Sequence, residues 1–106
     1  MYKQLIIVCD FTIDSSILND FDYLITSNIE LTSQYQCKIN NEIVDFDYLI
    51  ITNKISKRIM SEDGYIITYN NFETNIDNYF AIGNCIRSNK DINEQLKIII
   101  EYLKEN

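Results

Sequence analysis

Residues 20–25 read Asp-Phe-Asp-Tyr-Leu-Ile, and the same six residues recur at positions 45–50. Each copy continues to an Asn, at Asn28 and Asn53. A polar start, an apolar run and a polar exit are typical of a buried strand, and Asn suits the exit because it tolerates a positive φ. Two copies are too few for a solenoid, so the repeat predicts two similar strands in one sheet.

The segments around the repeat predict further short elements. Residues 5–8 (Leu-Ile-Ile-Val) form a continuous apolar run that predicts a strand buried on both faces. Residues 10–16 supply a loop and the start of a short helix. A hairpin is predicted over 36–44 with Asn40-Asn41 in its turn. Strands are also expected at 65–69 and 79–82, and a single helical turn at 56–61.

The clearest predicted helix is the last. Its apolar residues are spaced by four, three, one and three positions and form one stripe, namely Ile92, Leu96, Ile99, Ile100 and Leu103. Asp91 followed by Glu94 is typical of a capping box. Together the segments predict an α/β fold with a small, mainly parallel sheet, a short antiparallel hairpin and a C-terminal helix packed on one face.

Composition narrows the classes of partner. The chain has 106 residues, which suits one domain, and a net charge of −7. Its cations are scattered, with the densest group at Lys54, Lys57 and Arg58, so we expect neither nucleic acid nor an anionic membrane as a partner. The longest apolar runs fall well short of 18 residues, and the N-terminus does not resemble a secretion signal. The expected compartment is the cytoplasm.

Residues that bear chemistry are few. Histidine is absent, and the widely spaced Cys9, Cys37 and Cys85 suggest reduced thiols rather than a disulfide scaffold or a zinc site. Without histidine, the serines and threonines lack the base of an ordinary triad. Cys85 is either an inert thiol, which we favour, or a thiol activated by a nearby helix N-terminus.

The repeat also places two pairs of carboxylates at its strand starts, Asp20 with Asp22 and Asp45 with Asp47. If the two repeat strands lie side by side, these pairs could gather a hard cation. We favour the simpler interpretation that they are solvated strand ends, and we predict no metal.

Four segments of the second half follow a fixed order: 47–53, 63–66 (Asp-Gly-Tyr-Ile), 73–75 and 78–85 (Asn-Tyr-Phe-Ala-Ile-Gly-Asn-Cys). With the final helix, this order resembles the end of the pyridine-nucleotide–disulfide oxidoreductases, thioredoxin reductase in particular. In that family a Gly-Asp pair after the last strand closes on FAD, and its carboxylate hydrogen-bonds the ribityl chain. The resemblance implies that Gly83 and Asn84 are the cofactor-binding residues if a flavin is bound.

The chain also departs from the family pattern. Asn84 replaces the family's Asp and lacks the charge that strengthens a hydrogen bond. Residues 3–8 correspond to the family's first strand, which should be followed by G-x-G-x-x-G, whose backbone N–H groups approach a pyrophosphate. Residues 9–14 instead read Cys-Asp-Phe-Thr-Ile-Asp, without glycine and with two carboxylates that repel phosphate. Residues 1–106 also contain no C-x-x-C pair, and we expect no NADPH domain of the family's kind.

The sequence therefore predicts one degenerate flavin-domain-like domain over residues 1–106, resembling a truncated FAD/NAD(P)-binding domain. We expect a non-catalytic interaction module, with a flavoprotein, another protein or a second copy as its partner and without a cofactor. A non-enzyme is favoured over an enzyme. The alternative is a residual flavin- or nucleotide-binding electron-transfer protein that holds FAD with Gly83 and Asn84 in a site completed by another chain.

Overall fold

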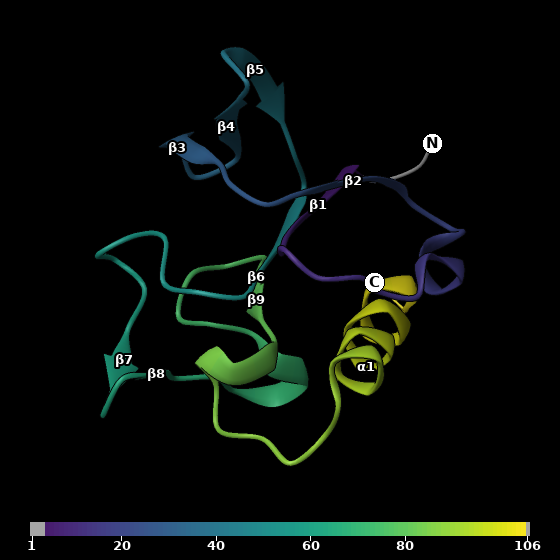
Figure 1. Ribbon diagram of the computed structural model, residues 1–106, viewed down its shortest axis with the longest axis vertical. Helices are drawn as coiled ribbons and strands as arrows, with labels where there is room; N and C mark the ends of the chain where they lie inside the picture. Colours follow the sequence, from purple (N-terminus) through teal and green to yellow (C-terminus); the bar gives the residue numbers. More distant parts are fainter. Residues whose placement is uncertain (1–3, 106) are drawn as a thin grey trace.

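Four parallel strands form the central sheet of the computed structural model, which describes residues 4–105. In spatial order they are β2 (Asp22–Thr26), β1 (Gln4–Val8), β6 (Tyr48–Ile51) and β9 (Tyr79–Ala81) (Figure 1). The predicted α/β fold with a mainly parallel sheet is confirmed. Residue 3, which we expected at the start of the first strand, lies outside the described residues.

The two copies of the repeat become β2 and β6, which lie on either side of β1 in the same register. Leu24 of β2 and Leu49 of β6, for example, are both level with Ile6 of β1. The prediction of two similar strands in one sheet is confirmed. The copies differ in burial, because Leu49 is 0% exposed in the interior of the sheet whereas Leu24 is 38% exposed on its outer strand.

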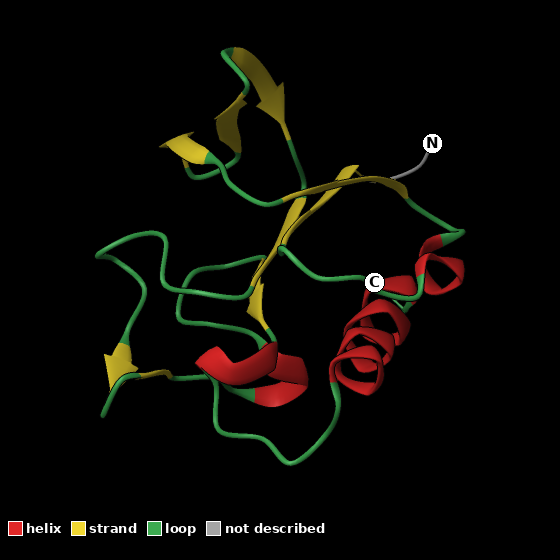
Figure 2. Ribbon diagram, viewed as in Figure 1, coloured by secondary structure: helices red, strands yellow, loops and turns green. Residues whose placement is uncertain are grey.

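The C-terminal helix α1 (Ile92–Lys104) covers one face of the sheet (Figure 2). Its predicted stripe packs on apolar residues of three strands: Leu5 and Ile7 of β1, Ile50 of β6 and Phe80 of β9. Asp91 begins the helix, since its Oδ1 accepts a hydrogen bond of 3.0 Å from the Glu94 N–H. The Glu94 carboxylate pairs with Lys90 at 3.4 Å. The predicted N-cap and helix are therefore confirmed.

A small antiparallel sheet and irregular chain pack on the other face. The small sheet contains β3 (Glu30–Ser33), β4 (Gln36–Ile39) and β5 (Glu42–Asp45). β4 and β5 are the predicted hairpin, and Asn40 and Asn41 have φ of 50° and 68°, as a two-residue turn of the I′ type requires. We did not predict β3, because its residues mix apolar and polar types. Cys37 of β4 is fully buried in the second core cluster.

Residues 56–61, where one helical turn was expected, make one hydrogen-bonded turn, with Ile59 N donating to Ser56 O at 3.2 Å. Two other expectations for the connecting segments were wrong. The strand predicted over 65–69 is only β8 (Tyr65–Ile66), paired with β7 (Ser61–Glu62). Beyond β8 the backbone makes one more bond to the same neighbouring segment, from Ile67 N to Met60 O at 3.0 Å, before the chain enters η2 (Asn70–Phe72), where Asn71 has φ of 59°. Asn28 and Asn53 do not use a positive φ at their strand exits.

The repeat provides a matched test of the sheet order. Leu49→Ala should lower the free energy of unfolding by about 2–4 kcal/mol because it leaves a cavity in a filled core. Leu24→Ala should cost less than about 1 kcal/mol because Leu24 lies partly in solvent. Urea unfolding of both variants measures the difference. Equal losses would contradict the placement of β2 at the edge.

Candidate functional site

The carboxyl ends of β1, β6 and β9 meet at one edge of the sheet, because the strands are parallel. The chain goes from β1 to its neighbour β2, and the later strands β6 and β9 are added on the opposite side of β1. The direction in which strands are added to the sheet therefore switches between β1 and β6. In open α/β sheets ligands bind outside the carboxyl ends at such a switch point. The Thr52 hydroxyl ties the two strands there by donating to Val8 O at 2.8 Å.

The loop after β1 is held in place by side-chain hydrogen bonds of Asp14, Ser16 and Asn93. It leads into η1 (Ser15–Leu18), a short 3₁₀ helix in place of a full helix. The Asp14 carboxylate caps η1, accepting hydrogen bonds from Ser16 N at 3.1 Å and from Ser16 Oγ at 2.6 Å. These bonds, that of the hydroxyl first, lower the pKa of Asp14. Asp14 N itself donates to Asn93 Oδ1 at 3.0 Å, which fastens the loop to α1.

The predicted residues Gly83 and Asn84 lie in η3 (Gly83–Cys85), directly beyond β9. Gly83 has φ of +85°, and its N–H donates to Gln95 Oε1 at 2.7 Å. Gln95 is almost fully buried and donates from Nε2 to Lys90 O at 3.0 Å, so its side chain fixes the turn to the start of α1. The backbone donor of Gly83 is therefore already engaged, while the Asn84 side chain is exposed.

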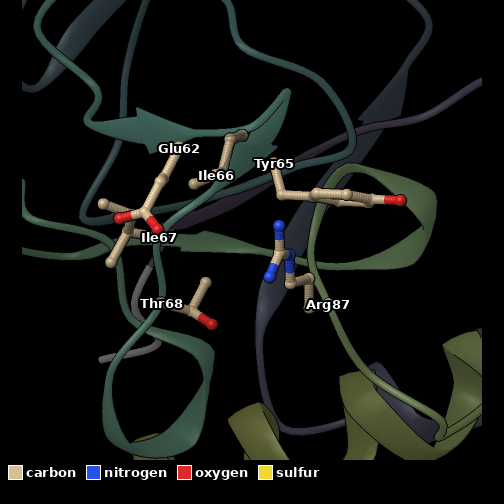
Figure 3. A pocket seen from close by; sticks show the side chains of 6 residues that line it. All are labelled: Glu62, Tyr65, Ile66, Ile67, Thr68 and Arg87. Carbon is tan, nitrogen blue, oxygen red and sulfur yellow. The ribbon is translucent and has the colours of Figure 1, made fainter.

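An open hollow lies beside Asn84, and sequence analysis did not predict it. Arg87 and Tyr65 line it from two separate segments, with the guanidinium carbon 5.0 Å from the centroid of the tyrosine ring. Figure 3 shows these two side chains stacked together on one side of an adjoining pocket of about 250 Å³, with Glu62 on the opposite side. Arg87 also pairs with Asp63 at 3.1 Å, and both partners are largely exposed. Tyr65 and Arg87 are more than 20 positions apart in the chain, and no sequence motif indicated that their side chains would meet.

The cysteines are free thiols in environments that disfavour the thiolate. Burial raises the pKa of Cys85 to about 11. Its Sγ donates to Ile82 O at 3.2 Å. Burial also raises the pKa of Cys9 and of Cys37. The inert interpretation of Cys85 fits this environment, and the proposed activation by a helix N-terminus does not.

The repeat does not gather its carboxylates. β2 and β6 are separated by β1, about 10 Å apart at two strand spacings. Asp20 pairs with Lys104 at 2.8 Å, and Asp47 Oδ2 accepts from Gln4 N at 2.8 Å. Within residues 4–105 the structure has no cluster of three or more cysteine, aspartate or glutamate side chains suited to a metal.

Comparison with known proteins adds a weak structural relation. Neither a protein-family model nor a curated protein matches the chain. Among solved structures, the chain is similar to a ferredoxin-flavin thioredoxin reductase from Clostridium acetobutylicum, with a TM-score of 0.40 and 14% identity. The match covers 98% of this chain and 50% of that one, so the chain spans about half the length of the reductase. At this level the relation does not assign a function. Over the described residues, helices long and apolar enough to cross a membrane are absent.

Gly83 is required for its backbone conformation. A Cβ there would lie 3.4 Å from Ile92 Cδ1, an ordinary contact, but φ of +85° strains any L side chain. Gly83→Ala should therefore cost about 1 kcal/mol or more of unfolding free energy. Gly64→Ala, at φ of +83° with open space around it, should cost a similar amount. Asn84→Ala should have little effect on urea midpoints, and an unchanged midpoint for Gly83→Ala would refute this role.

The Cys85 thiol should react slowly near neutral pH. With a pKa of about 11, its thiolate is a small fraction at pH 8, and that fraction should grow through pH 10 and 11. Mass-spectrometric iodoacetamide labelling of the Cys9→Ser/Cys37→Ser variant, with circular dichroism to confirm folding, measures this dependence. A labelling midpoint below pH 8.5 would show that the thiol is activated.

Proposed function

We propose that the chain is a non-catalytic interaction module that keeps the strand arrangement of a nucleotide-binding sheet without binding a nucleotide. The observation that carries the proposal is the Asp14 carboxylate at the N-terminus of η1. In doubly wound folds this position, at the first turn after β1, receives the pyrophosphate. Here a carboxylate of the chain itself occupies the anion position.

The donors that a phosphate needs are also engaged. Ser16 N and Ser16 Oγ donate to Asp14, and Asp14 N donates to Asn93. A phosphate would have to displace the carboxylate from these partners and then lie beside its charge, and the exposed Asp10 adds a second charge to the loop. The displacement and the charge repulsion both oppose anion binding. A neutral capping residue would only have to be displaced, whereas a carboxylate also repels a phosphate.

Catalytic chemistry has little support among the described residues. Burial raises the pKa of all three cysteines, which disfavours their thiolates, and the chain lacks histidine as a base. The surface instead exposes large apolar side chains, among them Tyr23, Leu24 and Ile25 of the outer strand β2. Exposed apolar groups of this kind favour contact with another protein.

The alternative function is a residual flavin- or nucleotide-binding electron carrier whose site is completed by another chain. The hollow beside Asn84 favours it, because Arg87 offers a cation and Tyr65 an aromatic face next to the predicted Gly83-Asn84 pair. The pairing of Arg87 with Asp63 weakens that offer, since the cation is already partly neutralised. We rank this function second for that reason.

Calorimetric titration separates the two functions. The interaction module should bind FAD with a dissociation constant weaker than about 10 μM, a binding free energy short of about −7 kcal/mol. Thermal melts with and without FAD and FMN should coincide for the native chain, Asn84→Asp and Asn84→Ala. A melting shift that Asn84→Asp enlarges and Asn84→Ala abolishes would establish the electron carrier instead.

A further inference from the structure

β2 has the sequence of an interior strand but lies at the edge of the sheet. Its Tyr23, Leu24 and Ile25 repeat the Tyr-Leu-Ile of β6, yet they are 41%, 38% and 39% exposed. β6 is bordered by β1 on one side and by β9 on the other, whereas β2 pairs only with β1 among the described strands. The side of β2 facing away from β1 is therefore an unpaired strand edge.

The hydrogen bonds show which backbone groups of β2 are free to pair. Thr26 O accepts from Cys9 N at 2.8 Å, so Thr26 directs its backbone groups toward β1. Alternate residues of a strand bond to the same side, so Leu24 and Asp22 also face β1. Tyr23 and Ile25 therefore direct their N–H and C=O groups outward, two donors and two acceptors in a row.

The edge also lacks the usual protection against pairing. Natural edge strands are commonly guarded by lysine, proline or a bulge. Residues 22–26 contain neither lysine nor proline, and the ladder with β1 runs without a register shift. Asp22, at one end, is the only charge in the strand.

We propose that β2 pairs antiparallel with β2 of a second copy, around a two-fold axis at Leu24, and joins two four-stranded sheets into one of eight. This deepens the proposed function, on which it rests, by naming a second copy as the partner. The register sets Tyr23 opposite Ile25 of the second copy and Ile25 opposite its Tyr23. Because these residues present the outward groups, all four backbone hydrogen bonds of the pairing form.

The outward backbone groups select this arrangement over an in-register parallel one. In the antiparallel register Tyr23 and Ile25 face each other's outward groups, and each Asp22 lies opposite Thr26 of the other copy, an uncharged residue with a hydroxyl. An in-register parallel pairing would require Tyr23 to bond residues 22 and 24 of the other copy, whose backbone groups already face β1. The antiparallel contact also uses the same surface on both copies and closes after two chains.

Side chains complete the contact on both faces of the joined sheet. Tyr23 and Ile25 are level with Leu5 and Ile7 of β1, so they share the face that carries α1. There each aromatic ring meets a β-branched side chain of the second copy, a favourable cross-strand pair. On the other face the two Leu24 side chains meet at the axis.

The size and charge of the contact define its strength. A standard stable interface buries about 800 Å² of surface on each partner. A contact of five paired residues buries less than that, so the dimer should dissociate reversibly. Two copies that each carry a net charge of −7 repel each other. Added salt screens this repulsion and should strengthen the dimer.

Sedimentation velocity with reductant present tests the proposal on the full chain. Between about 5 μM and about 1 mM, the weight-average mass should rise from the chain mass of 12.5 kDa toward twice that value. Leu24→Lys sets two cations against each other at the axis and should weaken dimerisation at least about tenfold. Ile43→Lys is the matched control, because Ile43 is 55% exposed on β5, a different strand edge, and should leave the dimer unchanged.

Amide hydrogen exchange on the native chain tests the register without a substitution. Exchange at Tyr23 and Ile25 should slow as concentration rises, whereas Leu24, already bonded to β1, should exchange slowly at every concentration. A native chain that stays monomeric to about 1 mM overturns the proposal, as does a dimer disrupted by Ile43→Lys and not by Leu24→Lys. FAD titration tests the proposed function separately from the dimer. If the chain dimerises through β2 and also binds FAD, only the proposal of a non-binding module is refuted. If the chain is monomeric and does not bind FAD, only the pairing of β2 is refuted.

Discussion

The burial of β1 on both faces and along both edges is the constraint on which the rest of the structure depends. Leu5, Ile6 and Ile7 have no exposed surface, so each face of the strand needs an apolar cover and each edge needs a strand. The two repeat copies supply the edges, α1 covers one face, and Cys37 of β4 packs on the other. The side chains of residues 5–8 are apolar and offer no hydrogen-bond partners. The buried N–H and C=O groups of β1 are therefore satisfied by the backbones of β2 and β6.

Elements whose information is local could be predicted from the sequence. The Asn40-Asn41 hairpin and the capped helix after Asp91 formed as expected, because turn chemistry and an apolar stripe determine each within a few residues. The identical copies at 20–25 and 45–50 show the limit of such reasoning. Their sequences give the same strand, but burial depends on β9, which joins β6 from about 30 residues away in the chain and has no equivalent beside β2.

Some features of the candidate site could likewise be predicted from the sequence, and others could not. The missing glycines and the two carboxylates of the 9–14 loop were visible in the sequence, and so was the Gly83-Asn84 turn. The short helix expected to start within residues 10–16 is η1, but its capping by Asp14 was not predicted, because Asp10, Thr12 and Ser15 are equally suitable capping residues in the same segment. The buried Gln95 that holds Gly83 also escaped prediction, since a glutamine on an amphipathic helix ordinarily faces solvent. Arg87 meets Tyr65 only because the chain folds back after β8.

The shortage of glycine affects tight turns and a phosphate-binding loop differently. The chain has two glycines, and Asn40, Asn41, Asn71 and Asn78 take positive φ values that glycine would otherwise supply. Asparagine can replace glycine there because the turn requires only a backbone conformation, which its side chain tolerates. A phosphate-binding loop requires in addition that no Cβ separate the backbone from the ligand. No substitute for glycine meets that second requirement, so residues 9–14, which contain no glycine, do not meet it, whereas the asparagine turns still form. Asp14 stabilises the N-terminal end of η1 with its own carboxylate, and the exposed edge of β2 is the surface where we propose that the fold gains further contacts.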